Sequence, residues 1–311
     1  MTRRFSVLIA LTLLLGGWGC DSLTPAAWPP QTPAVSPAPS DPAITEFNKG
    51  VGFAEREDWE TAIACFSEAI RLKPDYAEAY FNRGNVYREK GESDQAITDY
   101  TEVIRLNPDW EAHTYRGNAY REKGESDQAI TDYTEAIRLK PDWEAYNRRA
   151  GAYCEKGEYD KAIKDYSEAI RLDPDPAGYH NRGLAYDEKG EYDKAIKDFS
   201  EAIRLKPDYA QAYYIRGRIY LRGGERDKAI KDCSEAIRLK PDYAKAYFNR
   251  GFAYDEKGWY DKAVENFSEA IRLEPADAMA YRHRGFAYLK QGDQAKADAD
   301  FAKEKELKAK K

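Results

Sequence analysis

A proline that returns every 33 or 34 residues is the feature that most constrains how this 311-residue chain can fold. It closes near-identical phrases of the form AIRLKPD, at intervals of 34, 33, 33, 33, 34 and 34 residues. These prolines are Pro74, Pro108, Pro141, Pro174, Pro207, Pro241 and Pro275. A constant interval of this length is typical of arrays in which each repeat buries its apolar face against the next. The sequence therefore predicts a row of equivalent repeats rather than one ordinary core.

Each repeat is expected to be a pair of antiparallel helices. In the repeat that ends at Pro108, apolar and small residues recur at helical spacing in two blocks, residues 79–91 and 92–108. A glycine separates the blocks, as expected at the end of a helix. The predicted fold class is all-α.

Residues at fixed places in each repeat resemble the tetratricopeptide repeat family, whose pattern is an aromatic residue, Gly, Tyr, Ala, an aromatic residue, Ala and Pro. In one repeat these places are held by Tyr80, Gly84, Tyr87, Ala96, Tyr100, Val103 and Pro108. The resemblance implies a right-handed α-solenoid of about eight helix-turn-helix repeats over residues 43–311, with the last helix as a cap. A basic residue precedes the glycine in each repeat, and its aliphatic stem is expected to cover apolar surface while the charged head stays in water.

The first residues have a different character. Arg3 and Arg4 precede the apolar run Phe5–Leu15, and small residues then lead to Cys20, so residues 1–19 are expected to be a secretory signal peptide. The end of this segment resembles the lipobox of bacterial lipoproteins, which implies that Cys20 carries a lipid. We expect an exported protein of the cell envelope, anchored to the membrane on the periplasmic side, or periplasmic if it is not lipidated.

Residues 20–42 are expected to be a lipidated cysteine followed by a linker. The segment Asp21–Pro42 contains seven prolines among its 22 residues. Such a composition favours an extended stalk and cannot build a core.

The composition argues against several functions. A formal net charge of −6 disfavours binding to nucleic acid. His113, His180 and His283 lie in different repeats, so no metal site is expected, and no phosphate-binding glycine motif occurs. We expect no catalytic residue, no cofactor, no metal and no small-molecule substrate, and hence not an enzyme.

The resemblance implies that the first helix of each repeat lines a concave groove that binds extended peptides. Asparagine often stands two residues before the glycine, and its amide could hold a peptide backbone because it donates and accepts hydrogen bonds. Phe81 would add apolar contact, and Arg88, Arg121 and Arg148 could meet carboxylates. The candidate groove residues are Asn48, Phe81, Asn82, Asn85, Arg88, Asn118, Arg121, Asn147, Arg148, Asn181 and Asn249. Alternatively, each asparagine is a neutral surface residue that was copied with its repeat.

The predicted function is that of a non-catalytic scaffold or adaptor of the cell envelope, which binds other proteins or peptides and attaches to the membrane through an N-terminal lipid. The alternative is a structural envelope protein that associates with itself through the ends or the convex face of the solenoid.

Overall fold

The computed structural model describes residues 41–309. The expected signal peptide, Cys20 and nearly all of the linker lie outside the described residues, so those expectations remain predictions.

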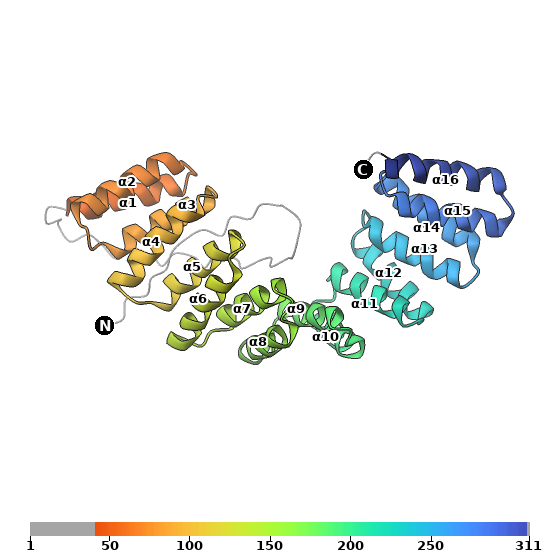
Figure 1. The fold of residues 1–311 in the computed structure, drawn as a ribbon, viewed down its shortest axis with the longest axis horizontal. Coiled ribbons are helices and arrows are strands. Elements are labelled where there is room, and N and C mark those ends of the chain that lie inside the picture. The colour runs from red at the N-terminus through yellow and green to blue at the C-terminus, as the bar shows by residue number, and fades with distance from the viewer. Residues whose placement is uncertain (1–40, 310–311) are drawn as a thin grey trace, which may run out of the picture. The chain divides into compact units, whose positions relative to one another are not determined.

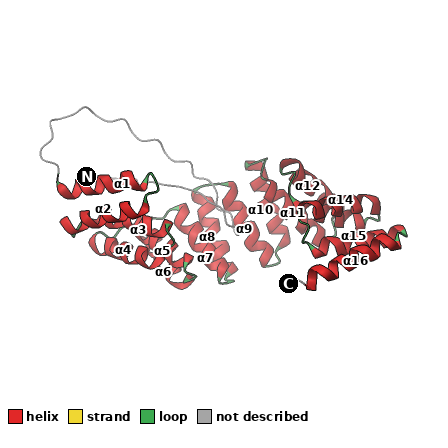
Figure 2. Ribbon diagram, turned by 90° about the horizontal axis from the view of Figure 1, so that it is seen from above, coloured by secondary structure: helices red, strands yellow, loops and turns green. Residues whose placement is uncertain are grey.

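Residues 41–309 form sixteen α-helices and no strand (Figures 1 and 2). The first helices of the pairs are α1 (Pro42–Ala54), α3 (Ala77–Glu89), α5 (Trp110–Glu122), α7 (Trp143–Glu155), α9 (Pro176–Glu188), α11 (Ala210–Arg222), α13 (Ala244–Glu256) and α15 (Ala278–Gln291). The second helices are α2 (Trp59–Leu72), α4 (Ser93–Leu106), α6 (Ser126–Leu139), α8 (Tyr159–Leu172), α10 (Tyr192–Leu205), α12 (Arg226–Leu239), α14 (Tyr260–Leu273) and α16 (Gln294–Ala309). The predicted all-α solenoid of helix-pair repeats is confirmed.

The chain divides into two compact units, Met1–Asp165 and Tyr166–Lys311, with the boundary inside α8. In the first unit α1 packs on α2, α3 on α4 and α5 on α6, and α2·α3, α4·α5 and α6·α7 contacts join successive pairs. In the second unit α9 packs on α10, and the pairs α11·α12, α13·α14 and α15·α16 follow in the same way. Figure 1 shows the two helices of a pair side by side, as for α3 and α4 and for α15 and α16.

In most repeats the core is built from alanines and one aromatic side chain of the second helix, and Cys233 takes the place of the aromatic residue on α12. Tyr100 on α4 is fully buried against α3. A Cβ atom at Gly84 would lie 3.0 Å from the Tyr100 ring, so glycine lets the two helices approach closely, while Ala150 holds the same place on α7.

The turn between the helices of a pair needs a left-handed backbone. Gly91 has φ +77° there, and the later repeats also use glycine. The first repeat instead places Glu57 at this position, with φ 60°.

Candidate functional site

The basic residue before the glycine is bound rather than solvated. Arg83 donates from Nε and Nη2 to the two carboxylate oxygens of Asp99 on α4, at 2.8 and 2.7 Å. Its Nη1 donates to Ser67 Oγ in the preceding repeat, at 2.9 Å. Only 18% of the Arg83 side chain and 4% of the Asp99 side chain are exposed. The expectation that these charged heads stay in water is wrong for the arginines, because each guanidinium binds a buried acceptor on the second helix of its own repeat, whereas the Lys49 side chain of the first repeat is 54% exposed.

We call this set of contacts the arginine ladder. Its other carboxylate rungs are Arg116–Asp132, Arg149–Asp165, Arg182–Asp198, Arg216–Asp232 and Arg284–Asp300. One repeat substitutes a neutral acceptor, where Arg250 Nε donates to Asn266 Oδ1 at 2.8 Å. The first repeat has no rung, since Lys49 pairs with Glu46 at 2.6 Å.

The rungs differ in their electrostatics. Burial raises the pKa of the Asp99 carboxyl, and Arg83 only partly opposes this. Burial also acts on Asp132, but Arg116 and His113 outweigh it and lower that pKa. His113 Nδ1 lies 3.0 Å from Asp132 Oδ1, which gives this histidine a structural partner.

The two asparagines that follow the glycine hold tyrosine hydroxyls. Tyr100 donates its hydroxyl to Asn85 Oδ1 at 2.7 Å, and Tyr133 donates to Asn118 Oδ1 at 2.8 Å. Burial raises the pKa of Tyr133 to about 12, so the hydroxyl stays protonated. A buried hydroxyl needs such a partner. The sequence itself indicates this pairing, because repeats with phenylalanine in place of the tyrosine, such as Phe199, lack the asparagine.

The asparagines two residues before the glycine do not share one environment. Asn48 is exposed, Asn181 and Asn249 are half-buried, and Asn82 is buried. Asn82 Nδ2 donates to the carbonyl oxygen of Glu78 in its own helix at 2.7 Å. Asn147 is also half-buried. The structure therefore shows no uniform row of exposed amides within residues 41–309.

Several predicted residues do meet in one hollow of about 60 Å³ in the first unit. It lies against the first helices α1, α3 and α5, with contributions from α2. Its walls are Val51, Ala54, Trp59, Phe66, Asn82, Asn85, Val86, Arg88, Glu89 and Tyr115. Asn85 uses only Oδ1 and Asn82 only Nδ2 in hydrogen bonds among the described residues, so the second amide atom of each of these lining residues has no protein partner there.

The predicted carboxylate-binding arginines already have partners. Arg88 Nη2 donates to Glu89 at 3.0 Å, and its guanidinium carbon lies 5.4 Å from the centre of the Tyr115 ring. Arg121 Nε donates to Glu155 Oε1 at 2.6 Å.

Arg148 is held in the same way. Its Nε donates to Glu144 Oε1 at 2.9 Å, and its Nη1 donates to Asn118 Oδ1 at 3.1 Å. An incoming carboxylate would share each of the three arginines with a glutamate, and the like charges of the two carboxylates would weaken its binding.

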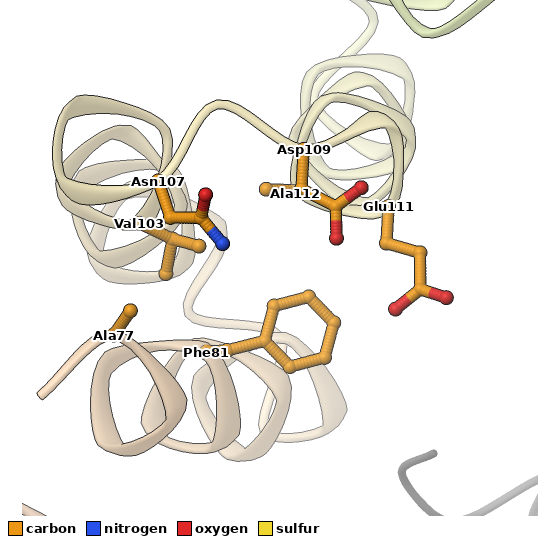
Figure 3. A pocket seen from close by; sticks show the side chains of 7 residues that line it. All are labelled: Ala77, Phe81, Val103, Asn107, Asp109, Glu111 and Ala112. Carbon is orange, nitrogen blue, oxygen red and sulfur yellow. The ribbon is translucent and has the colours of Figure 1, made fainter. Parts of the chain in front are cut away.

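Phe81 belongs to the core rather than to an open wall. It is buried between the rings of Tyr100 and Tyr115, whose centres lie 5.8 and 5.0 Å away. Its edge reaches a second pocket, of about 20 Å³, between α3, α4 and α5 (Figure 3). Glu111 lines this pocket beside Asp109, and burial, assisted by Asp109, raises the pKa of Glu111 to about 7.

That pocket offers a titratable carboxyl without the other parts of a catalytic set. The seven lining side chains in Figure 3 include no His, Cys, Ser or Lys beside Glu111. No group of three or more His, Cys, Asp and Glu residues that could hold a metal ion occurs in residues 41–309. The same part of the chain contains no helix that is both long and apolar enough to span a bilayer.

Family comparisons agree with this geometry. A tetratricopeptide model described as "Cilia and flagella-associated protein 70 C-terminal domain" matches residues 102–309. Models described as "TPR repeat" and "Tetratricopeptide repeat" match residues 52–88 and 77–109. Since the longest match covers more than half of the chain, the chain belongs to the tetratricopeptide repeat family. Proteins of this family generally serve as protein–protein interaction scaffolds.

Solved structures show the same fold. MamA is 31% identical to this chain, and the match covers 52% of this chain and 95% of MamA, with a TM-score of 0.50. The C-terminal part of a TPR repeat-containing protein from Cytophaga hutchinsonii is 20% identical, with a TM-score of 0.66 and coverage of 76% of this chain and 98% of that one. YrrB, described as a TPR protein with an unusual peptide-binding site, is 23% identical, with a TM-score of 0.51 and coverage of 58% and 95%. No curated protein is significantly similar to the chain.

Proposed function

We propose that this chain is a non-catalytic scaffold of the cell envelope that binds an extended segment of another protein over the hollow of α1, α3 and α5. The observation that carries the proposal is that two asparagines line this hollow and each keeps one amide atom without a protein partner among the described residues. Asn85 Nδ2 can donate to a peptide carbonyl and Asn82 Oδ1 can accept from a peptide N–H.

The rest of the hollow suits a peptide side chain. Val51, Val86 and Trp59 supply apolar contact, and Arg88 and Glu89 place opposite charges at its edge. Ligand sites commonly combine an apolar lining with a few placed polar groups. YrrB, a protein of this fold, is described as having an unusual peptide-binding site. This similarity supports peptides as the class of ligand, and it does not locate the site on this chain.

Attachment to the envelope is part of the proposal. It rests on the apolar run Phe5–Leu15 and the small residues before Cys20. A lipid on Cys20 and the proline-rich segment after it would hold the folded repeats away from the membrane surface.

Crosslinked partners from envelope extracts would test the binding surface. We would compare the wild type with a variant carrying Asn82→Ala, Asn85→Leu and Tyr100→Phe. The exchange of Asn85 and Tyr100 together copies the natural combination of Leu184 and Phe199, so it leaves no buried hydroxyl without a partner.

The matched control is Tyr100→Phe alone, which keeps both amides of the hollow. We expect the triple variant to lose the partners and the control to retain them. If the wild type, the triple variant and the control crosslink to the same partners, the binding surface lies elsewhere.

Self-association remains the second candidate, because the second helices end in leucines that stay exposed. These are Leu72, Leu139, Leu172 and Leu205. Light scattering over a range of concentrations distinguishes this candidate from a monomeric scaffold. A mass that rises with concentration and falls when these leucines are replaced by Gln would favour it.

A further inference from the structure

Asp187 on α9 is a buried carboxylate whose charge is paired with two arginines of the next repeat. Only 2% of the Asp187 side chain is exposed, and its oxygens accept from Arg218 Nη2 and from Arg222 Nη1 on α11, the latter at 3.0 Å. The two arginines stand 31 and 35 residues after the aspartate. Burial of a charge is tolerable when it is paired in this way.

Asp255 on α13 occupies the equivalent place two repeats later but lacks those partners. The residues 31 and 35 positions after it are Phe286 and Lys290. Asp255 Oδ1 is buried and has no hydrogen-bond partner in residues 41–309. Burial raises the pKa of this carboxyl, while His283 and Lys290 attract it from a distance without closing an ion pair.

Apolar side chains are exposed on α15, the helix that carries the residues 31 and 35 positions after Asp255. Phe286 is 41% exposed, and Met279 and Leu289 on the same helix are also exposed. Phe252 and His283 join α13 to α15 through an edge-to-face contact of 5.4 Å.

The Phe286 ring already makes one cation–π contact. The guanidinium carbon of Arg282 lies 5.7 Å from its centre. A second guanidinium between this ring and Asp255 would gain both a cation–π contact and a charge-assisted hydrogen bond.

We propose that the face of α13 and α15 around Asp255 binds an arginine side chain of an extended peptide segment. The arginine takes the place that Arg218 and Arg222 fill beside Asp187. The exposed apolar residues of α15 contact the neighbouring side chains of the same segment. This site lies on other helices than the hollow of α1, α3 and α5, and it rests on the proposed scaffold function only in that its occupant belongs to another protein.

A random peptide library displayed on phage would be selected on the full chain in detergent and on the Asp255→Asn variant. We expect selection on the wild type to enrich arginine at one position and selection on the variant to lose that enrichment. The affinity of the best peptide should fall about tenfold or more in the variant. A peptide with citrulline in place of the arginine keeps the shape without the charge, and it should lose a similar factor on the wild type.

A second variant fills the site from within the chain. Phe286→Arg with Lys290→Arg recreates the partners of Asp187 and keeps the Asp255 carboxylate. We expect it to remain folded, with an unfolding midpoint at or above that of the wild type, and to lose the arginine peptides.

Four results would overturn the proposal. If selected peptides carry no enriched basic residue, or bind Asp255→Asn as tightly as the wild type, the Asp255 site is excluded while the scaffold function stands. If the double variant still binds arginine peptides as tightly as the wild type, the site lies elsewhere. If no peptide is selected on the full chain at all, this site and the proposed scaffold function fail together.

Discussion

Single positions in this chain can be compared across repeats, so the protein contains its own controls. Phe81, His180 and Phe248 occupy the same place in three repeats. Phe81 packs between two tyrosine rings. The His180 ring, 2% exposed, packs on Phe199 and stacks on Tyr209, and its Nδ1 has no hydrogen-bond partner among the described residues. Histidine thus brings a buried polar atom into a site that phenylalanine fills without one.

Exchange of His180 for phenylalanine should stabilise the second unit and change its pH dependence. Burial lowers the pKa of His180 to about 4, from about 6.5 when unfolded. The unfolded chain therefore binds the extra proton first, so stability is full above pH 6.5 and falls as the pH drops towards 4. We expect His180→Phe to gain about 1 kcal/mol at pH 7 and up to about 3 kcal/mol more near pH 4.

Thermal unfolding followed by circular dichroism at pH 7.5 and 4.5 measures both effects. The reverse exchange, Phe81→His, is the matched control, and it should add the same kind of acid sensitivity to the first unit. Parallel pH profiles for the wild type and His180→Phe would contradict the assignment.

At the scale of helices and turns, the periodic pattern predicted the pairs because every helix reuses the same local signals. The glycine that admits the Tyr100 ring was predicted from its place in the repeat. The arginine ladder was not, because Arg83 and Asp99 lie 16 residues apart on different helices, and their pairing depends on the angle between these helices. The role of Asn85 was missed for the same reason, since its partner is the hydroxyl of Tyr100 on the facing helix. Side-chain periodicity assigns a residue to one face of its own helix but not to a partner on the next.

The turn of the first repeat should be improvable. Glu57 adopts φ 60° where later repeats place glycine, a conformation that costs a residue with a side chain roughly 1 kcal/mol. We expect Glu57→Gly to stabilise the first unit by about this amount, which a shift in the urea midpoint at constant m-value would report. Glu57→Ala keeps a Cβ atom and should give no comparable gain. Equal midpoints for Glu57→Gly and the wild type would contradict the expected backbone strain.

At the scale of the whole molecule, the proposed function gives separate tasks to the described repeats and to the residues before Asp41. The repeats carry the hollow and the Asp255 face, whereas the proposed attachment depends on Cys20 alone. No segment of the described repeats is suited to cross a membrane. Attachment and binding should therefore be separable by mutation.

Replacement of Cys20 by serine should release the protein from the membrane fraction without changing its fold. The expected result in a bacterial host is a shift from the membrane pellet to the periplasmic extract, together with loss of acyl incorporation measured by mass spectrometry. The circular dichroism spectrum should stay helical. A Cys20→Ser protein that remains in the membrane fraction would show that another feature anchors it.

The hydroxyl contacts of the arginine ladder have a consequence for how such a gene can change. Each rung joins a guanidinium in one repeat to a serine or threonine in the repeat before it, as Arg216 does with Ser200. The contact is nearly the same at each junction where it forms, so a duplicated or deleted segment of 33 or 34 residues would recreate it at the new junction. Recombination between the near-identical phrases could then lengthen or shorten the array without a new interface having to evolve. The positions that differ between repeats, Asp255 among them, would be carried along as movable binding elements.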